Sequence, residues 1–171
     1  RGYKPVWIGS KGLTDMADEL VNIIEYAREF GLEPENYRIS DIRNHMNQIW
    51  KMADSKTPID LELEILLTNA AFRMMINLHA GYQAFDSVLF AHAWVNELPE
   101  ILMKGIAGQN VLESLLSLEP RFIEYQKLRK ANAIFIRSNA LNDHITDIKY
   151  PGKDSTVLMN EIREALMSLG Y

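Results

Sequence analysis

The stretch 59–78, IDLELEILLTNAAFRMMINL, is apolar on every face of a helix and not along one stripe. One helical face carries Leu61, Ile65, Leu66, Phe72, Met75 and Ile76. The other faces carry Leu63, Leu67, Ala70, Met74 and Leu78. Because a helix that is apolar all round needs neighbours on every side, the pattern predicts a central, buried helix from about Asp60 to His79. We interpret Asp60 and Glu64 as solvated capping residues in its first turns, where the helix dipole favours negative charge.

A membrane span is the other interpretation of such an apolar run. The charged residues Glu64 and Arg73 leave only positions 65–72 uncharged between them. A helix needs ~20 consecutive apolar residues to cross a bilayer. The sequence therefore predicts a helix buried in protein and not in lipid.

Before this central helix, the sequence pattern predicts an extended segment and two helices. Residues 1–12 are rich in Gly and Pro and carry Tyr3 and Trp7, which suits a segment anchored to a core. A helix is expected from Thr14 or Asp15 to Phe30, with Gly31 as its stop. A second helix is expected from Ser40 or Asp41, with an apolar face formed by Ile42, Met46, Ile49 and Ala53 and broadened by Trp50.

After the central helix, residues 82–96 lack a clean period and predict a loop with a short helix. Pro99 suits the first turn of a helix through Ala107, and Asn110 suits the cap of a short helix that ends before Pro120, so the two predict a helical hairpin. Residues 121–136 then predict an amphipathic helix built on Phe122, Tyr125, Leu128, Ala131 and Phe135.

The last helix is expected to begin at Ser155, after a break at Pro151 and Gly152. Its apolar side comprises Leu158, Ile162, Ala165, Leu166 and Leu169. Strand-like alternation never extends beyond a few positions. The sequence thus predicts an all-α fold, an irregular bundle of helices around the central one, with one domain over residues 1–150 and the first helix of another over residues 151–171.

Composition narrows the possible functions. The 171 residues are 47% apolar and carry a formal net charge of −5, which gives no basic field to hold nucleic acid. Cysteine is absent, which removes disulfides, thiolate metal sites and thiol nucleophiles. The chain opens on Arg1, with no basic and then apolar leader, so we expect a piece excised from a longer protein.

Candidate chemistry is sparse along the chain. None of His45, His79, His92 and His144 has a second histidine three or four positions away, so we expect no metal site and no cofactor. Trp7, Trp50 and Trp94 could line a groove for sugar or peptide, or could simply be core residues. Trp94, in an irregular segment, is the best candidate to face a partner, together with Tyr82 and Phe85.

The chain contains, in order, the segments GYKPVW, GLEPENY, LELEILLTNAAFRMMINLHAG, Trp94, LESLLSLEP, EYQKLRKA and PGKDSTVLMNEIREALMSLGY. In this order they resemble the scaffold domain of the large periplasmic L,D-transpeptidases, which cross-link peptidoglycan through a cysteine. The resemblance covers the whole length, and the last segment is similar to the start of the family's peptidoglycan-binding module.

The resemblance implies a periplasmic, non-catalytic scaffold that packs against the catalytic and peptidoglycan-binding modules of its parent chain and meets peptidoglycan through that parent. Three features depart from the family. The catalytic cysteine motif is absent, only the opening helix of the peptidoglycan-binding module is present, and Arg38 follows Tyr37 where the family often has a histidine.

Two other functions remain open from the residues alone. One is a free-standing helical module for protein–protein interaction through residues 82–96, with no role in the cell wall. The other is a cysteine-free muramidase or amidase, which would need a carboxylate in a cleft or a histidine-bound zinc. No residue of the sequence stands out for that chemistry.

Overall fold

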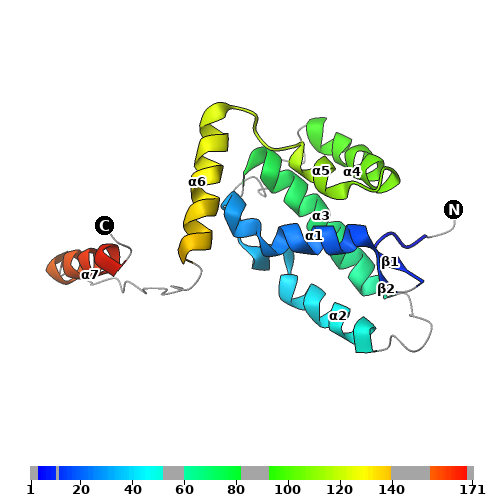
Figure 1. Cartoon of the computed structure of the whole chain (residues 1–171), viewed down its shortest axis with the longest axis horizontal. Helices are drawn as coiled ribbons and strands as arrows, with labels where there is room; N and C mark the ends of the chain where they lie inside the picture. Colours follow the sequence, from blue (N-terminus) through cyan, green and yellow to red (C-terminus); the bar gives the residue numbers. More distant parts are fainter. Residues whose placement is uncertain (1–3, 11, 52–59, 82–92, 140–154, 169–171) are drawn as a thin grey trace. The chain divides into compact units, whose positions relative to one another are not determined.

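The computed structural model describes residues 4–10, 12–51, 60–81, 93–139 and 155–168, and the chain divides into two compact units, Arg1–Ile136 and Arg137–Tyr171. The described residues are mainly helical, and a two-stranded sheet is present near the N-terminus (Figure 1). The predicted all-α class is therefore confirmed. The boundary predicted near Pro151 lies outside the described residues and stays a prediction.

The first unit begins with short strands and continues as a series of helices. Strands β1 (Ile8–Gly9) and β2 (Gly12–Leu13) are antiparallel, with Ile8 opposite Leu13. The helices that follow are α1 (Asp15–Glu25), η1 (Ala27–Phe30), η2 (Pro34–Tyr37), α2 (Ile39–Lys51), α3 (Leu61–Ala80), η5 (Ala93–Glu97), α4 (Leu98–Ala107), α5 (Val111–Leu116) and α6 (Ile123–Asn139). The last three residues of α6 belong to the second unit, which also contains α7 (Ser155–Ser168).

Helix α1 begins where its capping residue predicts. Thr14 is the N-cap, and its hydroxyl accepts a 3.3 Å hydrogen bond from the N–H of Ala17. The predicted single helix to Phe30 is divided in two, because α1 ends at Glu25 and the chain continues as the 3₁₀ helix η1. Gly31 ends η1 in the left-handed region with φ 74°, as its sequence position predicted.

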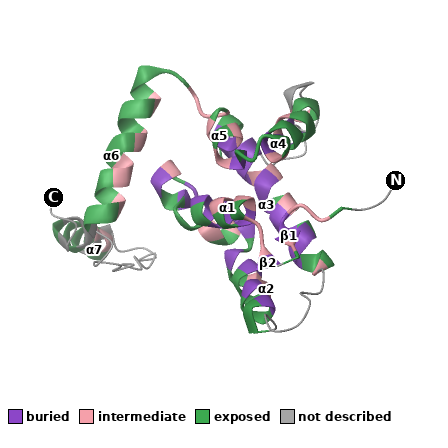
Figure 2. Ribbon diagram, turned by 45° about the vertical axis from the view of Figure 1, so that its right-hand side comes forward, coloured by how far each residue is buried: buried purple, intermediate pink, exposed green. Residues whose placement is uncertain are grey.

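Helix α3 is the centre of the first unit, as predicted. It contacts α1, α2, α4 and α5, and Leu63, Leu67, Met74 and Met75 on it are completely buried (Figure 2). The expectation that every face is covered was wrong at two positions, since Leu61 is 56% exposed and Ile65 is 67% exposed. One side of the first turns of α3 therefore faces solvent.

The apolar face predicted for α2 is partly correct. Ile42, Met46 and Ile49 are buried, and Ala53 lies outside the described residues. Trp50 does not broaden this face, because the side chain is 59% exposed. Trp7, in contrast, is only 1% exposed and anchors the N-terminal segment as expected.

The carboxylate of Glu64 fixes the N-terminal segment to α3. Glu64 is 3% exposed, and its oxygens accept hydrogen bonds from the backbone N–H groups of Val6 at 3.0 and 3.1 Å, of Trp7 at 2.8 Å and of Ile8 at 2.8 Å. The indole N–H of Trp7 also donates to the hydroxyl of Thr68 at 2.9 Å. The interpretation of Glu64 as a solvated capping residue was wrong. A buried carboxylate is costly unless it is hydrogen-bonded, and three backbone donors meet that requirement here.

Helices α4 and α5 form the predicted hairpin. Pro99 lies in the first turn of α4, and Asn110 is the N-cap of α5. Gly105 lies where the two helices approach closely, since a Cβ atom there would be 2.6 Å from the hydroxyl oxygen of Ser114. Helix α5 ends at Leu116, before Pro120 as predicted.

Candidate interaction surface

Residues 123–136 of α6, which belong to the first unit, make polar contacts with the rest of that unit. The amide of Asn132 donates to the backbone carbonyls of Arg28 at 2.8 Å and Glu29 at 3.1 Å. Arg129 pairs with the carboxylate of Glu119 at 3.0 Å. Its guanidinium carbon also lies 4.4 Å from the centre of the Phe30 ring, a cation–π geometry.

Tyr125 adds a second polar contact to the same carboxylate. Its hydroxyl donates to Oε1 of Glu119 at 3.0 Å. Burial, followed by the negative charge of Glu119 and this hydrogen bond, raises the pKa of Tyr125 to about 12, and Arg129 partly opposes the shift. The phenol therefore stays protonated near neutral pH and remains a hydrogen-bond donor.

Large apolar side chains are exposed on more than one side of α6. Residues 121–138 include none in the buried class, and Figure 2 shows the helix in the colours of exposed and intermediate residues. Leu128 is 71% exposed, Ile123 66%, Ile134 60% and Phe122, just before the helix, 58%. The predicted amphipathic helix exists, but its apolar stripe is not buried in the core of the first unit. Large apolar side chains left in water forfeit roughly 1.5–3 kcal/mol each, so the exposed part of α6 has the character of an interaction surface.

A groove of about 540 Å³ lies beside α6, where Asn132 and Ile136 face the segment that follows α1. Its opposite wall includes Arg28, Glu33 and Asn36, and Arg28 and Glu33 form an ion pair at 2.9 Å. This volume is in the range of small-molecule sites. The two charged side chains in its wall, Arg28 and Glu33, are paired with each other.

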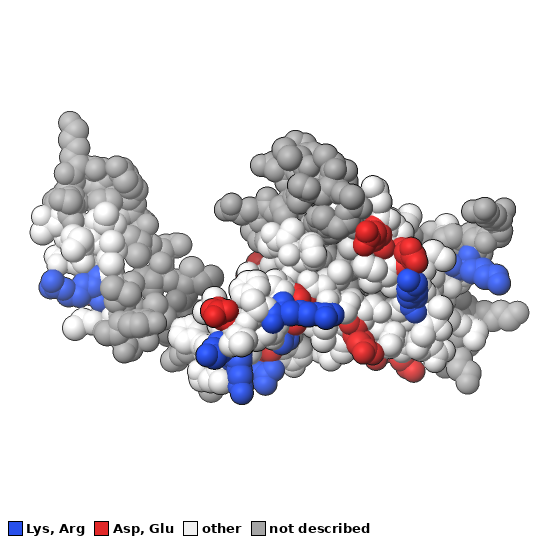
Figure 3. Space-filling model, turned by 90° about the horizontal axis from the view of Figure 1, so that it is seen from above, with Lys and Arg blue, Asp and Glu red and all other residues white. Residues whose placement is uncertain are grey.

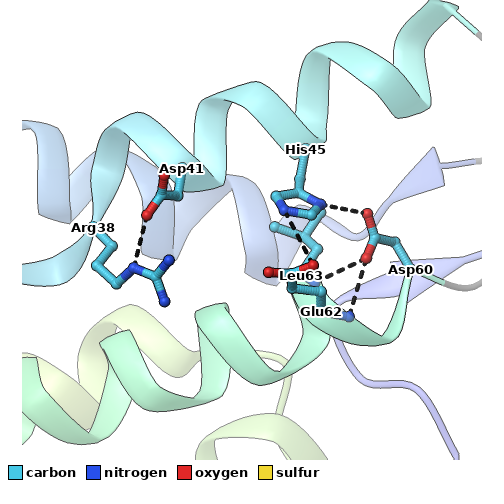
Figure 4. A network of polar contacts seen from close by, with 6 residues as sticks. All are labelled: Arg38, Asp41, His45, Asp60, Glu62 and Leu63. Atoms are coloured by element: carbon cyan, nitrogen blue, oxygen red, sulfur yellow. Dashed lines mark hydrogen bonds and ion pairs between the residues drawn. The ribbon is translucent and has the colours of Figure 1, made fainter.

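Helices α2 and α3 are joined by a second polar cluster, shown in Figure 4. Nδ1 of His45 lies 2.7 Å from Oδ2 of Asp60, and Nε2 lies 3.8 Å from a carboxylate oxygen of Glu62. The other oxygen of Asp60 accepts the N–H groups of Glu62 and Leu63 at 3.0 Å, which caps α3 as predicted for Asp60.

These contacts decide the charge of Asp60. Partial burial acts to raise the pKa of Asp60, but the hydrogen bonds from Leu63, His45 and Glu62 and the attraction of His45 outweigh it and lower the pKa. The residues drawn in Figure 4 include no hydroxyl or thiol that His45 could activate. The cluster therefore positions the start of α3 against α2.

Comparison with known families assigns the first unit. The sequence model of the family described as Scaffold domain matches residues 1–131. The chain belongs to the Scaffold domain family. No curated protein and no solved structure matches the chain.

The matched residues of this scaffold domain include α1 to α5 and the first half of α6. The partner-facing residues predicted from the sequence cannot be placed in this structure. Tyr82 and Phe85 lie outside the described residues, and Trp94 lies within η5 but its side chain is outside them. Their role stays a prediction.

Within the described ranges, no group of three His, Cys, Asp or Glu side chains could hold a metal ion. Across the same ranges, no helix of the scaffold domain or of α7 is both long and apolar enough to cross a bilayer.

Sequence reasoning missed three features of this scaffold domain. Glu64 could have been suspected from its position, because it shares a helical face with the apolar residues Leu67 and Ala71, and an acid that faces a core needs hydrogen-bond donors there. The outer side of α6 could have been found from the four- and three-residue spacing of its lysines and isoleucines. The contact between His45 and Asp60 had no signal, because the two residues come from different helices.

Proposed function

We propose that this chain is the non-catalytic scaffold of a cell-wall L,D-transpeptidase, an enzyme of peptidoglycan cross-linking or remodelling in the periplasm. The match to the Scaffold domain family over residues 1–131 carries the proposal, together with the ordered motifs that resemble this domain of the large L,D-transpeptidases. The parent's catalytic and peptidoglycan-binding modules are then its partners, and residues 151–171 begin the second of these modules.

The chemistry of the chain supports a division of labour. The L,D-transpeptidases use a cysteine thiolate as nucleophile, and this chain contains no cysteine. Acyl transfer therefore belongs to another part of the parent. This domain supplies a rigid frame, in which the Glu64 carboxylate fixes the N-terminal segment and α3 fills the core.

The second function that an observation favours is a free-standing helical module that binds another protein. The exposed apolar side of α6 would serve such a module equally well. Only the content of the complete reading frame separates the two, because the first requires a catalytic cysteine in the same polypeptide.

The test is an assay of the complete polypeptide on tetrapeptide donor stems. We expect cross-linking that disappears when a cysteine outside residues 1–171 is replaced by alanine, and no turnover by this chain alone. A reading frame that ends after Tyr171, or turnover by the rigorously purified chain, would overturn the proposal.

A further inference from the structure

Four residues of α6 form one stripe along its exposed side. Ile123, Lys127, Lys130 and Ile134 follow each other at four-, three- and four-residue spacing, so they share one helical face over about 16 Å. Ile123 and Ile134 are 66% and 60% exposed, and both lysines are exposed. No ion pair of Lys127 or Lys130 is present among the described residues.

The stripe is basic although the chain as a whole is acidic. The net charge of the chain is −5, whereas residues 121–134 carry Arg121, Lys127, Arg129 and Lys130 against Glu124. Arg129 is paired with Glu119, so the two lysines are the cations that this side presents next to the isoleucines. Figure 3 shows Lys and Arg side chains gathered over part of the first unit.

We propose that this stripe is a docking site for an acidic protein surface. Ile123 and Ile134 would enter apolar pockets at its two ends, and carboxylates between these pockets would meet Lys127 and Lys130. Charge complementarity selects this occupant, because burying the isoleucines also brings the two lysines into the interface, where an uncompensated charge is costly.

The same geometry disfavours two other occupants. In a membrane-bound amphipathic helix the apolar side chains form a face separate from the basic one, but here the lysines lie between the isoleucines on one stripe. In a symmetric pair of copies, an isologous contact would place Lys127 and Lys130 of one molecule against the same lysines of the other. Like charges in contact oppose that arrangement.

This inference goes beyond the proposed function, because it states the chemistry of the surface that α6 meets whether or not that surface belongs to an L,D-transpeptidase. The experiment uses the whole chain and a synthetic helical peptide with Leu, Glu, Glu and Leu at four-, three- and four-residue spacing. A second peptide has Lys in place of both Glu residues. Fluorescence anisotropy measures the binding of each peptide at low and high salt.

We expect the acidic peptide to bind the chain and the basic peptide not to bind. The double variant Lys127→Glu/Lys130→Glu should weaken binding of the acidic peptide by about tenfold or more and should bind the basic peptide instead. The matched control Lys4→Glu/Lys51→Glu makes the same change of charge at two other exposed lysines and should change the affinity less than about twofold. Circular dichroism of each variant reports whether the helices are retained.

Three results would overturn the proposal. The first is equal or absent binding of the two peptides by the chain. The second is binding to vesicles of phosphatidylglycerol, lost in the Lys127→Glu/Lys130→Glu variant, without binding of the acidic peptide. The third is concentration-dependent dimerisation in analytical ultracentrifugation that the same variant abolishes, which would assign the stripe to a second copy of the chain.

Discussion

The backbone N–H of Trp7 donates a 2.8 Å hydrogen bond to Oε1 of Glu64, 57 positions later in the chain. The same oxygen accepts the N–H of Ile8, and both oxygens lie within hydrogen-bond distance of the N–H of Val6. The Glu64 carboxylate thus accepts hydrogen bonds from three consecutive backbone N–H groups. The N-terminal segment is ordered against the central helix by this contact and by the burial of Trp7.

Replacing Glu64 by glutamine tests this contact. Glu64→Gln keeps the shape of the side chain but substitutes an NH₂ donor for one acceptor oxygen and removes the charge. We expect a loss of about 1.5–3 kcal/mol in the free energy of unfolding, the range for hydrogen bonds to charged groups. Urea unfolding measures this loss, with Glu124→Gln on the exposed side of α6 as the control. Equal effects of the two variants would show that the Glu64 carboxylate is not needed.

The central position of α3 predicts that alanine substitutions at two adjacent residues, Leu66 and Ile65, have very different effects on stability. Leu66 is 5% exposed and Ile65 is 67% exposed. Leu66→Ala should cost ~2–5 kcal/mol because it leaves a cavity among packed helices. Ile65→Ala should change stability by no more than about 0.5 kcal/mol. Phe72→Ala, at a partly buried position against the core, should also destabilise the domain. Similar denaturant midpoints for Leu66→Ala and Ile65→Ala would contradict the assignment of the two faces.

The pKa of Asp60 predicts how one part of the stability depends on pH. This pKa is lowered from its ordinary value of 3.8 in the folded chain, so the unfolded chain binds the proton more readily. The contribution of Asp60 is therefore present above pH ~4 and is lost as the pH falls through the lower, folded value. Asp60→Ala should cost about 1 kcal/mol at pH 6, the usual cost of a lost N-cap.

Urea unfolding of this variant and the wild type between pH 6 and pH 2 checks the sign. The difference between them should shrink as the pH falls below 3.8. A difference that stays constant or grows in acid would mean that the ionised carboxylate of Asp60 does not stabilise the folded state.

Helix α7 should exchange its amide hydrogens quickly. Met159 and Met167 are 62% and 68% exposed, and a helix of this length is marginal in water without tertiary contacts. Hydrogen exchange followed by mass spectrometry should show faster exchange in α7 than in α3, and slower exchange of α7 in a longer chain that contains the whole of its module. Strong and equal protection in both chains would mean that α7 belongs to the scaffold and that the boundary near Pro151 is wrong.

The sequence predicted the helices because local signals carry that information. Helix ends are marked by Thr14, Gly31, Pro99 and Asn110 through their own side-chain or backbone preferences, and the structure places them there. The all-round apolar pattern of α3 likewise identified the centre of the fold.

Exposure was harder to predict because it depends on contacts between distant segments. Trp50 and Leu128 sit on apolar stripes that look like core in the sequence, yet no neighbour covers them in the first unit. Glu64 shows the opposite case, because its burial depends on donors from the N-terminal segment. The spacing of the isoleucines and lysines on α6 is visible in the sequence, but only the structure shows that these side chains are exposed. Trp94, Tyr82 and Phe85 remain predictions from the sequence.

The most direct test of the scaffold role measures the heat resistance of transpeptidase activity in the complete polypeptide. If this domain supports the catalytic module, loosening its core must lower the temperature at which cross-linking is lost. We predict that Leu66→Ala lowers the midpoint of inactivation by about 5 °C or more, since each kcal/mol shifts melting by ~2–4 °C in domains of this size, and that Ile65→Ala leaves it unchanged. An inactivation midpoint that stays the same in Leu66→Ala while this domain itself melts earlier would contradict the scaffold function.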